Sequence, residues 1–224
     1  MFIGHYGAAF VAASRPRAPS LATLFVAAQL IDYGFFALLL LGVEHMRLVP
    51  RITAMNPMDL YAMPYTHSLL GALLWALGFG AVIGLAARRR EAGVLAGLVV
   101  LSHWLIDLLV HRPDLTLAGA PPRLGLGLWN LPAIEVPLEL AFAYGGLLFF
   151  ARATRPRGMG GRLSIAVLAI AMAVLQAVNW LTPQPQTVID PAPASAAWLG
   201  LFAYSLLALL AAWVARSRMT QAAG

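Results

Sequence analysis

Six apolar runs of about 20 residues constrain the fold of this chain more than any other feature. A helix rises 1.5 Å per residue, so about 20 apolar residues cross the hydrocarbon core of a bilayer. Of the 224 residues, 61% are hydrophobic and only 11% are charged, which is typical of a membrane protein. We therefore expect an all-α integral membrane protein with about six transmembrane helices. The expected spans are Leu21–Val43, His67–Ala87, Ala92–Val110, Ile134–Ala151, Leu163–Leu181 and Ala196–Ala215.

The arginines indicate how these spans are oriented. All fifteen residues counted as Lys or Arg are arginines, and the connections on the two sides of the expected membrane carry eleven and four of them. The positive-inside rule places the richer side, and with it both termini, in the cytoplasm. We expect a multi-pass protein of a bacterial-type inner membrane. Because topology accounts for the net charge of +6, no nucleic-acid partner is expected.

The first apolar segment, Phe2–Ala13, is too short to cross a membrane. As a helix, its ~12 residues would rise about 18 Å, roughly half of the hydrocarbon thickness. We expect a half-helix that begins near the midplane and leads through a turn into the first span. His5 and Asp32 would then lie at similar depths in the membrane.

The stretch from Leu101 to Asp114 holds the most unusual polar pattern. His103, Asp107 and His111 recur at i, i+4 and i+8, so on a helix they lie along one face. Their neighbours are apolar, and a carboxylate in such surroundings needs a cation, a proton or a dense hydrogen-bond network. His67 opens the second span at the same outer half of the bundle, so the polar residues are expected to converge there.

This polar group has the composition of a metal site. The chain has no cysteine, so its metal ligands would be nitrogen and oxygen atoms, as in many sites for zinc and other first-row divalent ions. A single histidine in a membrane more often forms a hydrogen bond between helices. Four of the five histidines lie in or beside apolar segments together with two intramembrane aspartates, and this grouping favours a divalent metal, with zinc expected.

The order of the short motifs resembles a known family. Gly4-His5 is followed by Asp32, then by Thr66-His67-Ser68, and then by Ser102-His103-x-x-x-Asp107. Over roughly residues 1–150, this order resembles the LexA-regulated inner-membrane metal-dependent hydrolase family. That family is distantly similar to zinc-dependent phospholipase C and to the single-strand nucleases that share its helical fold. The metal ligands that the resemblance implies are His5, Asp32, His67, His103 and Asp107.

The chain departs from the pattern of that family at two places. Members often carry a denser acidic stretch, Asp-x-Asp-His, where this chain has Ile31-Asp32-Tyr33. They also carry Arg-Gly before Thr-His-Ser, where this chain has Pro64-Tyr65. The number of metal ions therefore stays open. Two interpretations of His111 also stay open: a replacement for a missing ligand, and a surface histidine beside a loop.

Glu135 and Glu139 form an acidic pair at i and i+4, where the fourth span begins. One of them could complete the metal's ligand set or act as general base on a bound water. The alternative for Glu135 is a solvated position at the membrane interface. The alternative for Glu139 is an ion pair with Arg112 or Arg123. Glu139 and Asp32 are the candidate catalytic carboxylates.

Two long connections, Glu44–Thr66 and Pro113–Leu131, lie on the outer side and could form a lid over the site. Glu44 itself is expected to be a solvated interfacial residue, with a substrate contact as the alternative. Arginines in or beside these connections could hold a phosphate group. The candidate substrate-binding arginines are Arg47, Arg112 and Arg123.

Together these residues predict a membrane-embedded hydrolase in which a metal ion, held within residues 1–152, activates water against a phosphoester or lipid-linked substrate. Two alternatives from other classes stay open: a proton- or metal-coupled transporter, and a non-catalytic scaffold whose His/Asp cluster fixes helix register. Residues 153–224 hold two spans with few polar side chains, expected to serve as scaffold or as a homo-oligomer interface. The expected partners are the lipid bilayer and a small-molecule or lipid substrate.

Overall fold

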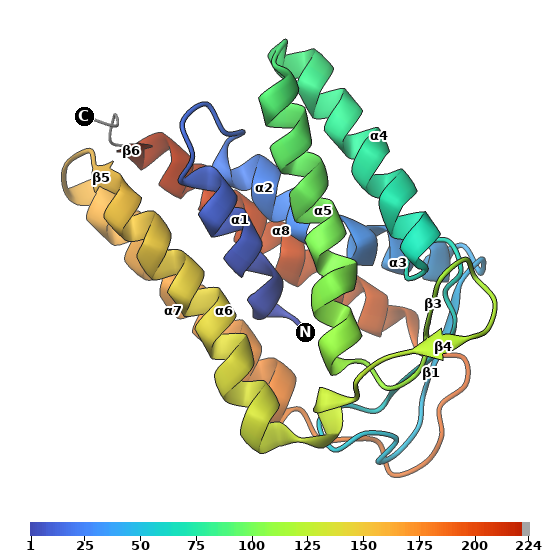
Figure 1. The fold of residues 1–224 in the computed structure, drawn as a ribbon. Coiled ribbons are helices and arrows are strands. Elements are labelled where there is room, and N and C mark those ends of the chain that lie inside the picture. Colours follow the sequence, from blue (N-terminus) through green and yellow to red (C-terminus); the bar gives the residue numbers. More distant parts are fainter. Residues whose placement is uncertain (221–224) are drawn as a thin grey trace.

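The computed structural model describes residues 1–220, and it shows a bundle of α-helices with three short strand pairs (Figure 1). The 3-10 helix η1 (Ile3–His5) leads into α1 (Tyr6–Ala13). The other helices are α2 (Leu21–Ala28), α3 (Leu30–Leu40), α4 (Leu69–Ala87), α5 (Arg90–Val110), η2 (Leu128–Asn130), α6 (Pro132–Ala153), α7 (Gly158–Leu181) and α8 (Ala194–Ser217). The antiparallel pairs are β1 (His45–Leu48) with β2 (Met58–Ala62), β3 (Leu115–Thr116) with β4 (Arg123–Leu124), and β5 (Thr154–Pro156) with β6 (Arg218–Thr220).

The helices have the lengths and the surfaces of membrane spans. Five of them, α4 to α8, are long and apolar enough to cross a bilayer, and α2 with α3 makes a sixth if that bent pair is one span. Large apolar side chains point away from the bundle: Leu77, Leu85 and Leu209 are 69%, 78% and 70% exposed. Such a surface is unfavourable in water, but the acyl chains of a bilayer cover it. The expectation of an all-α, multi-pass membrane protein is confirmed.

The first expected span, Leu21–Val43, is not one continuous helix. Its two parts, α2 and α3, meet at Gln29 with a bend of 54°. Gln29 leaves helical geometry, with φ −113° and ψ 10°, and its Nε2 donates to the carbonyl of Phe2 at 3.0 Å. At the same bend the carbonyl of Ala28 accepts a hydrogen bond from Nδ1 of His103 on α5 at 2.7 Å. The break in the span therefore supplies polar backbone to the middle of the bundle.

The expected half-helix is present as η1 and α1, and it lies inside the bundle, where its first residue is drawn at the centre of Figure 1. It packs against α2, α5 and α6. Ile3, Tyr6 and Phe10 are fully buried, and the rings of Tyr6 and Phe10 pack on Phe25 of α2, with centroids 4.2 Å and 5.1 Å apart. Because α1 ends at Ala13, this segment fills only one part of the bundle's depth.

The connections that hold β1 to β4 fold together at one end of the bundle, where β1, β3 and β4 are labelled in Figure 1. Leu48 of β1 pairs with Ile189 in the connection before α8. The amide of Met55 donates to the carbonyl of Trp129 in η2 at 3.1 Å. These contacts join three connections into one cover over the polar cluster described below.

The two C-terminal helices belong to the same bundle as residues 1–152. α8 packs along α2 and α3, and α7 packs against α6 and α8. The hydroxyl of Tyr204 on α8 donates to Asp32, and Nε2 of Gln176 on α7 donates to Glu139. Both helices therefore contribute polar side chains to the centre of the protein.

Candidate metal centre

The six residues predicted as metal ligands come together from four separate segments. Three overlapping groups each bring three ligand atoms within 4.8 Å of one another. Asp107 on α5 belongs to two of these groups, and all its neighbours in them are buried histidines. The three groups are His5 with His103 and Asp107, Asp32 with His67 and His103, and His67 with Asp107 and His111.

Both carboxylates face histidine ring nitrogens. Oδ1 of Asp107 lies 3.1 Å from Nε2 of His5, and its Oδ2 lies 3.0 Å from Nε2 of His103. Oδ1 of Asp32 lies 3.3 Å from Nε2 of His67 and 3.4 Å from Nε2 of His103. The other oxygen of Asp32 accepts a hydrogen bond from Tyr204 at 2.8 Å. His103 and Asp107, four residues apart on α5, therefore lie next to each other, as the sequence predicts.

His111 belongs to this cluster, and its interpretation as a surface histidine is wrong. Its ring is only 3% exposed, because Trp129 of η2 packs on it with ring centroids 4.2 Å apart. Its Nε2 lies 3.7 Å from Oδ2 of Asp107. The connection that carries Trp129 therefore covers His111 instead of leaving it in solvent.

The hydrogen bond to the bend in the first span determines the tautomer of His103. A carbonyl oxygen can only accept, so Nδ1 of His103 must carry the proton that it donates to Ala28. In the neutral ring, Nε2 then holds a lone pair. That lone pair faces the carboxylate oxygens of Asp107 and Asp32.

His67 is held in the same tautomer by a chain of two hydrogen bonds. The hydroxyl of Thr66 donates its only proton to Oε2 of Glu44 at 2.6 Å. Oγ1 of Thr66 therefore accepts from Nδ1 of His67 at 2.9 Å, which leaves the lone pair of Nε2 facing Asp32. Glu44 is fully buried and also accepts from the amides of Tyr65 and Thr66. The expectation that Glu44 is solvated is wrong.

His111 repeats the arrangement with a carboxylate. Its Nδ1 lies 2.8 Å from Oδ1 of the buried Asp114, which can only accept when ionised. When the rings are neutral, all three histidines thus present a lone pair on Nε2 to the carboxylate of Asp107 or Asp32. Either protons on Nε2 or a metal ion would satisfy this arrangement, and histidines oriented through Nδ1 by carboxylates or backbone carbonyls are typical of metal sites.

Two histidines also carry ring nitrogens without a hydrogen bond. Among the described residues, no hydrogen-bond partner is found for either ring nitrogen of His5 or for Nε2 of His103. The two rings stack with centroids 3.8 Å apart and planes 7° from parallel. Buried polar atoms without partners are costly, and a bound metal ion would satisfy those that face Asp107.

Glu139 organises the beginning of the chain beside the cluster. Its Oε1 accepts from the amides of Phe2 at 2.5 Å and Gly4 at 3.1 Å, and its Oε2 accepts from Gln176 at 2.9 Å. The amino group of Met1 consequently lies 3.1 Å from Oδ1 of Asp107. Glu139 therefore does not form the ion pair with Arg112 or Arg123 that was its alternative.

Glu135 is an acidic side chain beside the cluster with an oxygen that forms no hydrogen bond in the part of the chain that the structure describes. It is 1% exposed, so its interpretation as a solvated interfacial residue is wrong. Within residues 1–220, its Oε2 has no hydrogen-bond partner. Both Glu135 and Glu139 line the same cavity as Asp32, His67 and Asp107, so they lie within the candidate site.

This cavity has a volume of about 320 Å³ and a mixed lining. Ionisable residues of the cluster line it together with apolar side chains of α3, α7, α8 and the β1–β2 hairpin. The apolar residues include Phe36, Met46, Met58, Leu60 and Leu199.

The predicted phosphate-binding arginines lie outside this cavity. Arg47 and Arg112 both bind the buried carboxylate of Asp59, and Nε of Arg47 lies 2.7 Å from Oδ2. The hydrogen bond to Asp59 raises the pKa of Arg47 above its ordinary value. Arg123 is exposed on β4. A role of the three in substrate binding stays a prediction.

Four side chains that support the cluster were not predicted as site residues: Glu44, Asp114, Gln176 and Tyr204. Gln176 carries a usable signal, because it is a rare amide within an apolar span. Glu44 and Asp114 border long connections, where solvation is the ordinary expectation for an acid.

Comparisons of the chain with protein-family models, with curated proteins and with solved structures found no match.

Proposed function

We propose that this protein is a membrane-embedded metal-dependent hydrolase that uses a divalent ion, with zinc the best candidate. The observation that carries the proposal is the common orientation of His67, His103 and His111. Each donates through Nδ1 to a fixed acceptor and turns its Nε2 lone pair toward a buried carboxylate. Histidine nitrogen and carboxylate oxygen ligands suit zinc, and they also suit iron or manganese.

The residues that would hold the metal are those of the three ligand groups, with Asp107 at their centre. When bound, such an ion polarises a phosphoryl oxygen and lowers the pKa of bound water toward neutrality. Glu135 is the carboxylate best placed to take the proton of a nucleophilic water, because its Oε2 is unused and lines the cavity. Glu139 instead holds the backbone of residues 2–4 beside the cluster.

The cavity favours an amphiphilic phosphoester as substrate. Its ionisable residues would receive the polar group, while the apolar side chains of Met46, Met58 and Leu199 would receive hydrocarbon. The cavity lies within the helices that span the membrane, so a lipid or lipid-linked phosphoester can approach it from the bilayer. Arg47 and Arg112, one layer farther out, would assist a phosphate only by leaving Asp59.

The direct test of this function is hydrolysis by the purified protein in detergent. We expect metal-dependent release of phosphate or alcohol from a short-chain lipid phosphoester, and loss of that activity in Glu135→Gln with metal still bound. Glu91→Gln is the matched control, because it makes the same change from a carboxylate to an amide at the opposite end of α5. Bound metal without turnover of any phosphoester would refute the hydrolase and leave a structural or transport role for the ion.

The orientation in the membrane belongs to the same proposal. Eleven arginines lie in connections at the end of the bundle that carries β5 and β6, and four lie at the opposite end with the cluster. By the positive-inside rule, the cluster lies toward the outer face of an inner membrane, and both termini lie in the cytoplasm. A homo-oligomer through α7 and α8 stays a prediction.

A further inference from the structure

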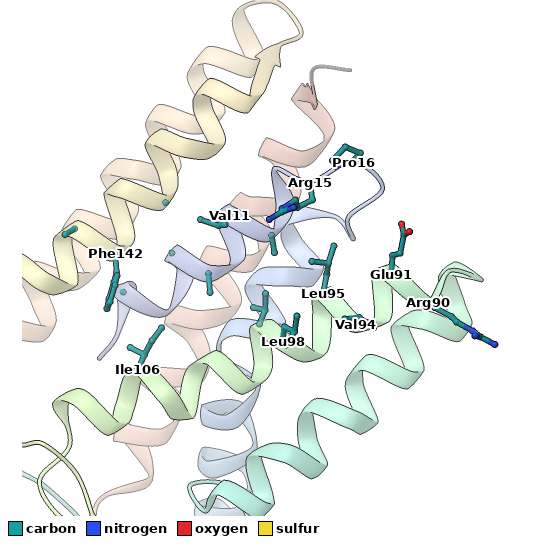
Figure 2. Close-up of a pocket in the computed structure, with 17 residues that line it drawn as sticks. Val11, Arg15, Pro16, Arg90, Glu91, Val94, Leu95, Leu98, Ile106 and Phe142 are labelled. Carbon is teal, nitrogen blue, oxygen red and sulfur yellow. The ribbon is translucent and has the colours of Figure 1, made fainter. Parts of the chain in front are cut away.

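A second cavity lies in the other half of the bundle, away from the metal cluster. It is a groove with a volume of about 920 Å³ between α1, α5 and α6 (Figure 2). Its floor is formed by small residues of α1, and its walls by apolar side chains of α5 and α6. Lining residues include Ala8, Val11, Leu95, Leu98 and Phe142.

The groove has the length of one leaflet of a bilayer. It runs from Gly4 to Arg15 along α1 and from Ile106 to Arg90 along α5, which at 1.5 Å per residue corresponds to about 17 Å and about 24 Å. One leaflet with its headgroup region measures about 20–22 Å. The inner end of the groove is closed where η1 meets the cluster, because His5 of η1 is buried there.

The lining of the groove suits a hydrocarbon chain. Apart from Arg15, Arg90 and Glu91, the lining residues are glycine, alanine, proline, valine, leucine, isoleucine and phenylalanine. Such a surface is favourably covered by an acyl chain.

The end of the groove that lies farther from the cluster is positively charged. Arg15, just after α1, and Arg90, the first residue of α5, both line that end (Figure 2). Arg88 and Arg89 directly precede Arg90 in the sequence. Both lining arginines are exposed, and within residues 1–220 neither forms an ion pair. Glu91 is the single acidic residue among those that line the groove.

We propose that this groove binds an anionic glycerophospholipid from the arginine-rich side of the membrane. One acyl chain lies along Val11 and Leu98, and the phosphate lies at the charged end of the groove beside Arg15, with Arg90 adding positive charge at the same end. Cationic side chains at headgroup level attract anionic lipids. The bound chain covers the exposed face of α1 and so steadies the segment that carries His5. This inference is independent of the metal and of the proposed hydrolase.

The test is native mass spectrometry of delipidated protein titrated with phosphatidylglycerol and with phosphatidylcholine of identical acyl chains. We expect wild type to bind the anionic lipid more tightly, by roughly five-fold for each arginine engaged. The double variant Arg15→Gln/Arg90→Gln loses this preference. The matched control is Arg155→Gln/Arg157→Gln, which removes two exposed arginines at the same end of the bundle but outside the groove.

A second variant tests the acyl chain separately from the headgroup. Ala8→Phe fills the groove, and we expect it to weaken both lipids equally while size exclusion shows an intact fold. Equal binding of the two lipids by wild type, or equal loss in the control variant, overturns the proposal. The chain has no native cysteine, so a disulfide-linked dimer formed by Val11→Cys would assign the groove to a second copy and would also overturn it.

Discussion

Glu44 is connected to the His/Asp cluster through Thr66, although nothing in the sequence distinguishes it from a solvated interfacial acid. The proton of Thr66 goes to Glu44, and this direction forces Nδ1 of His67 to donate. The carboxylate thus determines which ring nitrogen of His67 is available to a ligand. In metalloproteins, such indirect partners orient the ligand and raise its basicity.

We expect Glu44→Gln to weaken metal binding by about 10–100-fold, since the loss of an outer-shell partner typically has this effect. Thr66→Val should cause a similar loss, and the double variant little more, because both act through one chain of hydrogen bonds. The measurement is competition with a metallochromic chelator. Glu91→Gln is the control, because Glu91 is an exposed acid at the opposite end. Unchanged affinity in Glu44→Gln would show that the chain of hydrogen bonds is irrelevant to the metal.

Metal affinity should fall as the pH is lowered, because a histidine must be neutral to coordinate a metal. The Nε2 atoms that face Asp32 and Asp107 can coordinate a metal only through a free lone pair. We therefore expect weaker binding at about pH 6 than at about pH 8. Calorimetry in buffers of different ionisation enthalpy would detect the released protons. An affinity that is constant across this range would be evidence against imidazole ligands.

The sequence predicts the residues of the cluster well, but it does not predict the groups that form hydrogen bonds to them. His5, Asp32, His67, His103 and Asp107 meet as expected, because each is a polar side chain in an apolar setting that must find a partner. The supporting atoms could not be predicted in this way. The carbonyl of Ala28 belongs to an apolar residue, and its availability depends on a bend that the sequence does not reveal.

At the scale of elements, the apolar runs predict the positions of the spans. They do not predict the break that divides the first span into α2 and α3. The segment Leu21–Val43 is apolar apart from Gln29 and Asp32, and it contains no proline, so local sequence favours a single helix. Tertiary contacts prevail, because Gln29 bonds to Phe2 and His103 bonds to Ala28 at the bend. Both partners come from segments far away in the sequence.

The close pairing of α4 and α5 depends on glycine. A Cβ atom at Gly93 would collide with the carbonyl of Gly80, whereas a Cβ at Gly78 would meet nothing within 4 Å. We expect Gly93→Leu to destabilise the protein by about 1–3 kcal/mol or more through overpacking. Gly78→Leu, on the same helix pair, should be neutral or slightly stabilising, since leucine favours helix over glycine. Thermal unfolding in detergent compares the two, and equal unfolding temperatures would contradict the packing shown here.

At the scale of the whole molecule, the ligands come from η1, α3, α5 and the residue pair before α4. A metal ion at their centre would connect segments that are distant in the sequence. Binding to the folded state alone stabilises it by about 2.7 kcal/mol at a ligand concentration 100 times Kd. For a chain of this length, we expect the unfolding temperature to rise by about 5–10 °C with metal and to fall with a chelator. Asp107→Ala should show neither shift.

The most direct test of the central claim is elemental analysis of protein purified in detergent. Wild type would be compared with His103→Ala and Asp107→Ala, and size exclusion would establish that each is folded. We predict stoichiometric divalent metal in wild type and none in either variant. Folded wild-type protein that holds no metal, even after reconstitution with zinc or manganese, would contradict the account and leave the cluster as a network of protonated histidines and aspartates.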